Sequence, residues 1–205
     1  GVALTFTMDP VPSAIYNDYG PAVADALAWA LETSRLPVEL LTQPHLENNF
    51  YNLDYLDDLT IYLMPFNMPE ATAFHGGNEL DIVIGLDQSK LETEVIDLYD
   101  TVLHEMGHHV HDVLLPMDYF ENPAPWERYL QLRGGYAWPK NEIGHDGEPI
   151  EIFAEDVKMV FSNPRLVDQM RYDGAWGNVL DDPQMAARFE SFIRESAARG
   201  RTKGL

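Results

Sequence analysis

Apolar residues occur in short runs in the first half of the chain and at helical spacing in the second half. In the first half, segments rich in β-branched and aromatic residues end at turn residues, which predicts strands. Two of these segments flank a Gly76-Gly77 turn and predict a hairpin. A helix is expected to begin at Pro21, because proline suits the first turn of a helix. The expected strands cover residues 2–8, 38–41, 60–64, 71–75 and 80–86, and the helix covers residues 21–34.

The second half of the chain predicts helices separated by loops that contain proline or glycine. The expected helices cover residues 92–115, 126–133, 149–161, a short segment after Pro164, and about 183–198. We therefore expect an α+β fold, in which a small mixed sheet packs on the long helix and a mainly helical C-terminal half follows. A chain of 205 residues supports one well-buried core, so we expect a single domain over 1–205, sheet-rich over 1–90 and helical over 91–205.

The strongest chemical signal is the run His104-Glu105-Met106-Gly107-His108 within the longest expected helix. Residues four apart on an α-helix lie about 40° apart around its axis and about 6 Å along it, so both imidazoles can bind one ion. Zinc prefers such nitrogen ligands, and a catalytic site keeps one position for water. Glu105 is placed to act on that water as general base. On a helical wheel the two histidines lie opposite the apolar positions, which are Val95, Tyr99, Val102, Met106, Val110 and Val113.

Other residues of the same helix refine this prediction. Gly107 in mid-helix is unfavourable by about 1 kcal/mol relative to alanine, so we expect another segment to approach closely there. His109 lies toward the apolar side, which predicts a structural role. His111 lies nearer the histidine pair but about 10 Å along the axis from His104, too far for the same ion. The alternative interpretation is that His104 and His108 are surface residues of an amphipathic helix.

A third metal ligand must come from another segment. The metzincin pattern is not met, because a leucine occupies the position of its third histidine. Glu151 and Glu155 lie four apart on the expected helix 149–161, on the face opposite Phe153, Val157 and Val160. Two adjacent carboxylates repel each other unless a cation or donor lies between them. We expect Glu151 to bind zinc and Glu155 to hold a ligand histidine through its other ring nitrogen; a solvated acidic face is the alternative.

Composition narrows the partners and the metal ligands. Acidic residues outnumber basic ones 34 to 13, and the net charge of −21 disfavours nucleic acid and anionic membranes as partners. The absence of cysteine excludes disulfides, thiolate ligands and cysteine nucleophiles, so a metal must be held by histidine and carboxylate. No apolar run reaches the ~18 residues of a membrane span, so we expect no membrane insertion. The first residues lack a signal-peptide pattern, and the leading Gly1 suggests that a segment has been removed.

These motifs resemble those of the gluzincin metallopeptidases, over about residues 71–161. The closer resemblance is to the anthrax lethal factor-like group, which includes the Pro-Pro endopeptidases. Its first helix reads His-Glu-x-Gly-His and its second reads Glu-x-Phe-Ala-Glu, as both do here. The resemblance implies a zincin-like fold and one catalytic Zn²⁺. The residues it implies are His104, His108 and Glu151 as ligands, Glu105 as general base, Glu155 behind a ligand histidine, and Asp112, which resembles the aspartate on that helix in thermolysin-like enzymes.

One position departs from the pattern of that group. A tyrosine that supports the oxyanion is expected seven residues before the ligand glutamate, and Gly144 occupies that position. His145 is adjacent and can serve as the donor, as a histidine does in thermolysin-like enzymes. Tyr136, in the same loop, is the other candidate.

The resemblance implies a zinc-dependent endopeptidase that hydrolyses peptide or protein substrates. An extended substrate is expected to add to a sheet edge at residues 71–75, and a proline-rich sequence is conceivable. We expect a monomer at the surface or outside of a bacterium. The first alternative is a catalytically weak or inactive zinc-binding domain that acts in protein recognition or regulation. The second is a surface module with a structural zinc, whose fourth ligand would be His111 or Asp112.

Overall fold

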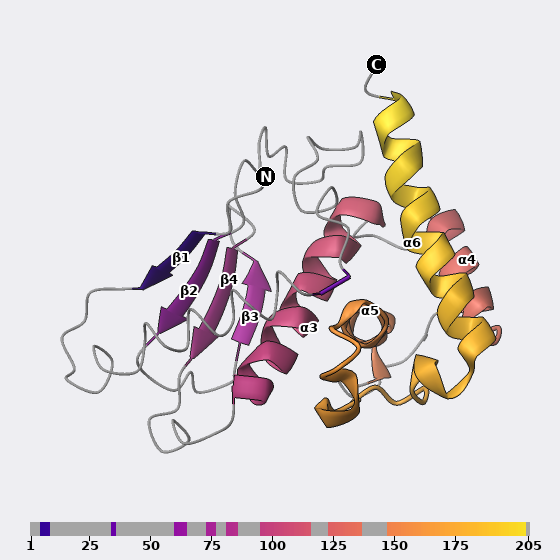
Figure 1. The fold of residues 1–205 in the computed structure, drawn as a ribbon. Helices are drawn as coiled ribbons and strands as arrows, with labels where there is room; N and C mark the ends of the chain where they lie inside the picture. The colour runs from indigo at the N-terminus through magenta and orange to yellow at the C-terminus, as the bar shows by residue number, and fades with distance from the viewer. Residues whose placement is uncertain are drawn as a thin grey trace.

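The computed structural model describes residues 5–8, 34–35, 60–64, 73–76, 81–85, 95–115, 123–136 and 147–203. The expected helix over 21–34, apart from Ser34, and the expected strand over 38–41 lie outside these residues. Figure 1 shows the described strands on one side of helix α3 and the other described helices on its opposite side. Helix α3 is therefore the element that joins the two parts.

Four short strands form one mixed sheet. They are β1 (Thr5–Met8), β2 (Thr60–Met64), β3 (Ala73–Gly76) and β4 (Asp81–Gly85). Their order is β1-β2-β4-β3, with β1 and β4 parallel to the strand β2 between them. Strand β3 pairs antiparallel with β4, which confirms the expected hairpin. In the described sheet β3 is the edge strand next to α3, so its outer side faces the helix that carries the histidine motif (Figure 1).

The described helices agree closely with the predicted ranges. The helix predicted over 149–161 is confirmed at both ends, whereas the one predicted over 126–133 begins earlier and the last one continues beyond 198. The elements are α3 (Val95–Leu114), α4 (Pro123–Leu132), α5 (Pro149–Phe161) and α6 (Pro183–Lys203), with the 3-10 helices η3 (Val167–Gln169) and η4 (Val179–Asp181). Helix α5 packs between α3 on one side and α4 and α6 on the other (Figure 1).

Aromatic side chains dominate the core between these helices. Phe153 of α5 makes edge-to-face contacts with Tyr129 of α4 and Phe189 of α6, at centroid distances of 5.1 and 5.5 Å. Trp126 and Tyr129 are fully buried and lie 6.0 Å apart. Such geometry adds about 0.5–1.5 kcal/mol per pair beyond the burial of area. This core fixes α5, and therefore the carboxylates on it, relative to the rest of the helices.

Gly107 allows α3 and α5 to approach closely. A Cβ atom at this position would lie 2.6 Å from both Cα and the carbonyl oxygen of Ala154. That separation is far below van der Waals contact, and the obstacle is backbone, which cannot rotate away. The expected close approach at Gly107 is confirmed, and the approaching segment is the helix that carries Glu151 and Glu155.

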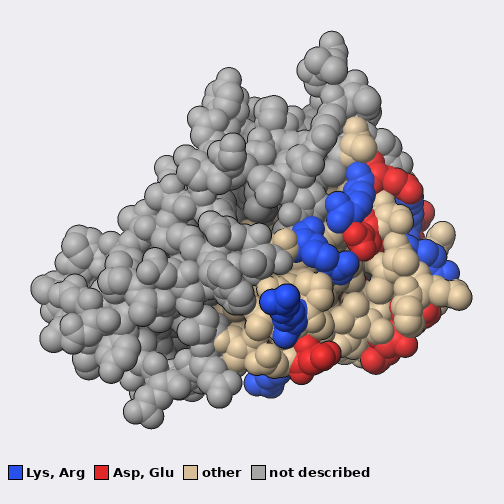
Figure 2. Space-filling view, in the orientation of Figure 1, with Lys and Arg blue, Asp and Glu red and all other residues tan. Residues whose placement is uncertain are grey.

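The described surface carries charges of both signs. Figure 2 shows basic and acidic side chains interspersed over the described residues on that face. Among the described helices, none combines the length and the apolar character that a membrane span requires.

Candidate metal centre

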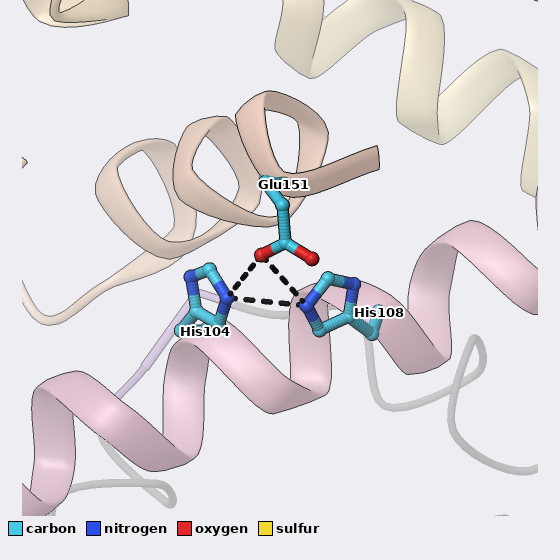
Figure 3. Close-up of side chains that lie close together, drawn as sticks. All are labelled: His104, His108 and Glu151. Atoms are coloured by element: carbon cyan, nitrogen blue, oxygen red, sulfur yellow. Dashed lines mark hydrogen bonds and ion pairs between the residues drawn. The ribbon is translucent and has the colours of Figure 1, made fainter. Parts of the chain in front are cut away.

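Two helices supply the side chains of the site. His104 and His108 lie one turn apart on α3 and point toward α5, and Glu151 points back at them from the first turn of α5 (Figure 3). Pro149 opens α5, and a carboxylate in the first turn is stabilised by the helix dipole. The three side chains are only 20%, 15% and 13% exposed, so they are not a solvated acidic face.

Three atoms of these side chains form a nearly equilateral triangle. The Nε2 atoms of His104 and His108 lie 3.1 Å apart. The Oε2 atom of Glu151 lies 3.2 Å from Nε2 of His104 and 3.4 Å from Nε2 of His108 (Figure 3). Tetrahedral coordination with bonds of about 2.0–2.1 Å requires ligand atoms about 3.3–3.4 Å apart. The separations therefore fit three ligands of one zinc ion.

Hydrogen bonds alone do not satisfy the two Nε2 atoms and the Oε2 atom, because one proton can lie between only two of them. A cation at the centre can interact with a lone pair of each atom. The donor set, two imidazoles and one carboxylate, is one that zinc uses at catalytic centres. Within the described residues, these three side chains form a group that could hold a metal ion.

Glu155 lies behind His104. Its Oε1 atom is 2.7 Å from Nδ1 of His104, on the opposite side of the ring from the triangle. A carboxylate at this distance accepts the Nδ1–H, so in the neutral ring, the form that binds a metal, Nε2 is the unprotonated nitrogen. His104 therefore directs its lone pair into the triangle. Sequence reasoning placed Glu155 in this role, and the structure brings the two side chains together.

The charges around the triangle favour a cation. Burial by itself lowers the pKa of His104, but hydrogen bonds to Glu151 and Glu155 and the charges of Glu155 and Glu105 raise it to about 9. Burial raises the pKa of Glu151, yet hydrogen bonds to His104 and His108 bring it well below its usual value. The carboxylates of Glu151, Glu155 and Glu105 thus surround His104 with negative charge, which is the sign of field that a metal cation requires.

A buried lysine belongs to this site and was not singled out from the sequence. Lys158 of α5 is 1% exposed, and its Nζ lies 2.8 Å from Oε1 of Glu155. The two residues are three apart, the spacing of neighbours on one helix face. That spacing was a usable signal for the contact with Glu155. The burial of Lys158 was not predicted, and in the structure all residues from Ile152 to Phe161 are buried.

Glu105 and His111 are the remaining candidate residues of α3 whose side chains the structure describes. Glu105 is 6% exposed, and its charge acts on the adjacent His104. His111 is buried, with its ring 5.0 Å from Trp126 and 6.0 Å from Phe153, so it packs in the core away from the metal triangle. The backbone of Asp112 lies in α3, and its side chain is outside the described residues, as is that of His109.

Of the two candidate oxyanion donors, Tyr136 lies within the described residues and His145 lies outside them. Tyr136 is 46% exposed and stacks on Trp176, with ring centroids 4.3 Å apart and planes at 11°. His145 and Gly144 lie outside the described residues. The assignment of an oxyanion donor remains a prediction.

Comparisons of the chain with protein-family models, with curated proteins and with solved structures found no match. The gluzincin resemblance therefore remains a prediction from the motifs. We base the functional proposal on those motifs and on the geometry of the site.

Proposed function

We propose that this chain is a zinc-dependent endopeptidase with a zincin-like α+β fold and a single catalytic domain. The observation that carries the proposal is the triangle of His104, His108 and Glu151, whose edges of 3.1–3.4 Å suit one tetrahedral ion. The contact of Glu155 with the far side of His104 supports it, because a carboxylate behind a ligand histidine is a recurrent feature of zinc sites.

The side chains supply the acid–base chemistry. His104, His108 and Glu151 would hold the zinc ion, which would supply a Lewis acid and lower the pKa of the attacking water to about 7. Glu105 takes the proton from that water and later delivers it to the leaving amine. Glu105 is buried and follows His104 on α3, and its charge acts on that histidine, which supports this role.

A peptide substrate fits the arrangement of β3 and α3. Strand β3 is the edge of the described sheet on the side of α3, and an extended chain can add to such an edge through backbone hydrogen bonds. His145 or Tyr136 is proposed as the oxyanion donor, which contributes roughly 3–4 kcal/mol to catalysis. Action outside a bacterial cell, on a protein substrate, is part of this proposal.

A catalytically weak or inactive zinc-binding domain is the second candidate. Two observations favour it: glycine occupies position 144, where the lethal factor-like group has its tyrosine, and Tyr136 stacks on Trp176. Such a domain would recognise or regulate a protein partner. It would bind zinc with the same three residues and leave peptides intact.

A peptide-library digest separates these candidates. The zinc-loaded protein is incubated with peptides of diverse sequence, including proline-rich ones, and the fragments are read by mass spectrometry. Glu105→Gln is the test variant, and Glu127→Gln on α4 is the matched control, because Glu127 is exposed. Cleavage by the parent and the control but not by Glu105→Gln supports the endopeptidase. Zinc binding without cleavage by any of the three overturns the endopeptidase and supports the second candidate.

A further inference from the structure

The carboxylate of Glu155 is held at both of its oxygen atoms. Oε1 accepts from Nδ1 of His104 at 2.7 Å and from Nζ of Lys158 at 2.8 Å. Oε2 accepts from the backbone N–H of Asp173 at 2.9 Å. The Glu155 side chain is 5% exposed, so water does not replace these partners easily. Two of its three partners, the Lys158 ammonium and the Asp173 backbone N–H, therefore restrain Glu155 without being proposed metal ligands.

Lys158 is itself held from the other helix. Its Nζ donates to Oδ2 of Asp100 at 3.0 Å, and Asp100 lies on α3 one turn before His104. The Lys158 side chain is 1% exposed, whereas that of Asp100 is 20% exposed. Lys158 thus links α3 to α5 at the level of the ligand histidine. A buried ammonium is costly without partners, so two carboxylates at this spacing hold it firmly in place.

Asp173 reaches Glu155 from a separate segment of the chain. It lies between η3 and η4, in the segment whose Tyr172 hydroxyl also contacts Asp156, 3.4 Å from its Oδ1. This segment therefore binds two consecutive residues of α5. Its donor to Glu155 is a backbone N–H, which no side-chain substitution except proline removes.

We propose that Lys158 and the backbone N–H of Asp173 form a positioning pair that fixes Glu155, and through it His104, for metal binding. The inference rests on the proposed zinc site. With both oxygens of Glu155 restrained, the ring of His104 is held in one orientation with Nε2 toward His108 and Glu151. Loss of either donor allows the carboxylate to rotate, and the ring of His104 loses its fixed direction. Supporting residues of this kind change metal affinity by about 10–100-fold in other zinc sites.

A purely structural role for Lys158 predicts a different outcome. A structural ion pair between α3 and α5 would change the free energy of unfolding independently of Glu155. A positioning role acts on the metal only through Glu155, so the effects of the two substitutions on zinc affinity must not add. A double-mutant cycle on zinc affinity distinguishes the two roles.

The cycle compares the parent, Lys158→Met, Glu155→Gln and the double variant by competition with a chelator for zinc. We expect about 10-fold weaker affinity for Lys158→Met and about 10–100-fold weaker affinity for Glu155→Gln. The double variant is expected to match Glu155→Gln within about threefold, and Lys158→Arg to recover most of the affinity. Arg194→Met is the control, since it breaks an exposed ion pair to Glu190 on α6. Unchanged affinity for Lys158→Met, or additive losses in the double variant, would overturn the positioning role of Lys158.

Asp173 provides the test if Lys158→Met does not fold. Asp173→Pro removes the N–H that contacts Glu155, whereas Asp173→Ala keeps it, and residue 173 is exposed. We expect zinc affinity to be at least about fivefold weaker for the proline variant than for the alanine variant. Equal affinities would overturn the pair. A parent that binds zinc but cleaves no peptide would overturn the proposed peptidase activity alone, whereas a parent that does not bind zinc would overturn both proposals.

Discussion

Helices α3 and α5 face each other across the candidate metal centre, and they differ in where their charged residues lie. On α3, the apolar residues Val102, Met106 and Val110 are buried, and the histidines occupy the partly exposed side. On α5, burial extends around the helix and includes the charged residues Asp156 and Lys158. The chemistry of α3 therefore follows from spacing on one helix. That of α5 depends on partners from several segments.

The burial of charge on α5 requires these partners. Asp156 is fully buried. Its Oδ2 atom forms an ion pair with Nε of Arg133 at 3.0 Å and accepts a hydrogen bond from the hydroxyl of Tyr129 at 2.9 Å. Arg133 also donates to the carbonyl of Gly177. This network joins α5 to α4 and to the segment before η4. We therefore expect substitutions on the histidine face of α3 to affect mainly the proposed activity, and those on α5 to affect both stability and the candidate metal centre.

The largest expected effect is on activity, from a residue of α3. Glu105→Gln should reduce peptide hydrolysis about 10²–10⁴-fold, because it removes the proposed general base. Zinc affinity should remain within about threefold of the parent, since Glu105 is not part of the metal triangle. Initial rates with a cleaved peptide and a zinc titration give both values. A variant that loses zinc as well as activity would contradict the separation of roles on α3.

Glu151 on α5 is expected to have the next largest effect, on metal binding. Glu151→Ala should weaken zinc affinity more than about 100-fold, beyond the usual cost of losing a supporting residue. Glu155→Gln provides the comparison and should lie within the 10–100-fold range. Chelator competition measures both. Full zinc affinity in Glu151→Ala would exclude it as a ligand.

Asp156 predicts a pH dependence of stability. Burial raises the pKa of its carboxyl to about 7, and the charge of Glu155 acts in the same direction. The charge of Arg133 and the hydrogen bonds from Tyr129 and Tyr172 lower this pKa but do not cancel the effect of burial. The folded state then holds a proton that the unfolded state releases near pH 4, so the contribution of Asp156 to stability is greatest below that value. The free energy of unfolding should decline, by a few kcal/mol at most, as pH rises from about 4 through 7.

The measurement is urea unfolding of the metal-free protein at several pH values. In Asp156→Asn the contribution of this group to the slope should vanish, whatever the absolute stability of the variant. The variant should also be less stable than the parent above pH 7, because Arg133 loses its ionised partner. An unchanged slope would show that Asp156 is ionised throughout this range.

Gly107 tests the contact between the two helices. Gly107→Ala should destabilise the protein by about 1–3 kcal/mol, because the new Cβ would overlap the backbone of Ala154. Zinc affinity should fall as well, since α5 must shift away from α3. Gly200→Ala in α6 is the matched control, and helix propensity favours it by about 1 kcal/mol. Destabilisation in the control equal to that at Gly107 would remove the argument from close packing.

The smallest effect is expected at an exposed ion pair. Arg128 and Glu195 lie 2.7 Å apart, with side chains 45% and 58% exposed. Glu195→Gln should change the free energy of unfolding by about 0.2–1 kcal/mol, and less in high salt. Urea unfolding at low and high salt tests this. An effect as large as that of Asp156→Asn would show that burial does not separate the two kinds of ion pair.

The sequence by itself determined the features that depend on local spacing. The interval between His104 and His108 places both on one helix face, and Pro149 marks the start of α5. The pairing of Glu151 with Glu155 pointed to a polar role for that face. Gly107 indicated a close approach, because glycine in mid-helix has a cost that a packing contact offsets. The two pairings follow from the periodicity of 3.6 residues per turn, and the roles of Pro149 and Gly107 follow from the backbone preferences of proline and glycine.

Tertiary structure alone decided which segments meet. The sequence did not show that Ala154 packs on Gly107, that His111 lies against Trp126, or that Lys158 contacts Asp100. Burial around the whole of α5 was also unforeseen, because charged residues in a sequence resemble a solvated face until their partners are known. Contacts between different helices depend on packing, so no local pattern specifies them. The three residues of the candidate metal centre and Glu155 were therefore predicted from motif and spacing, whereas Lys158 and the backbone N–H of Asp173, which contact Glu155, were not.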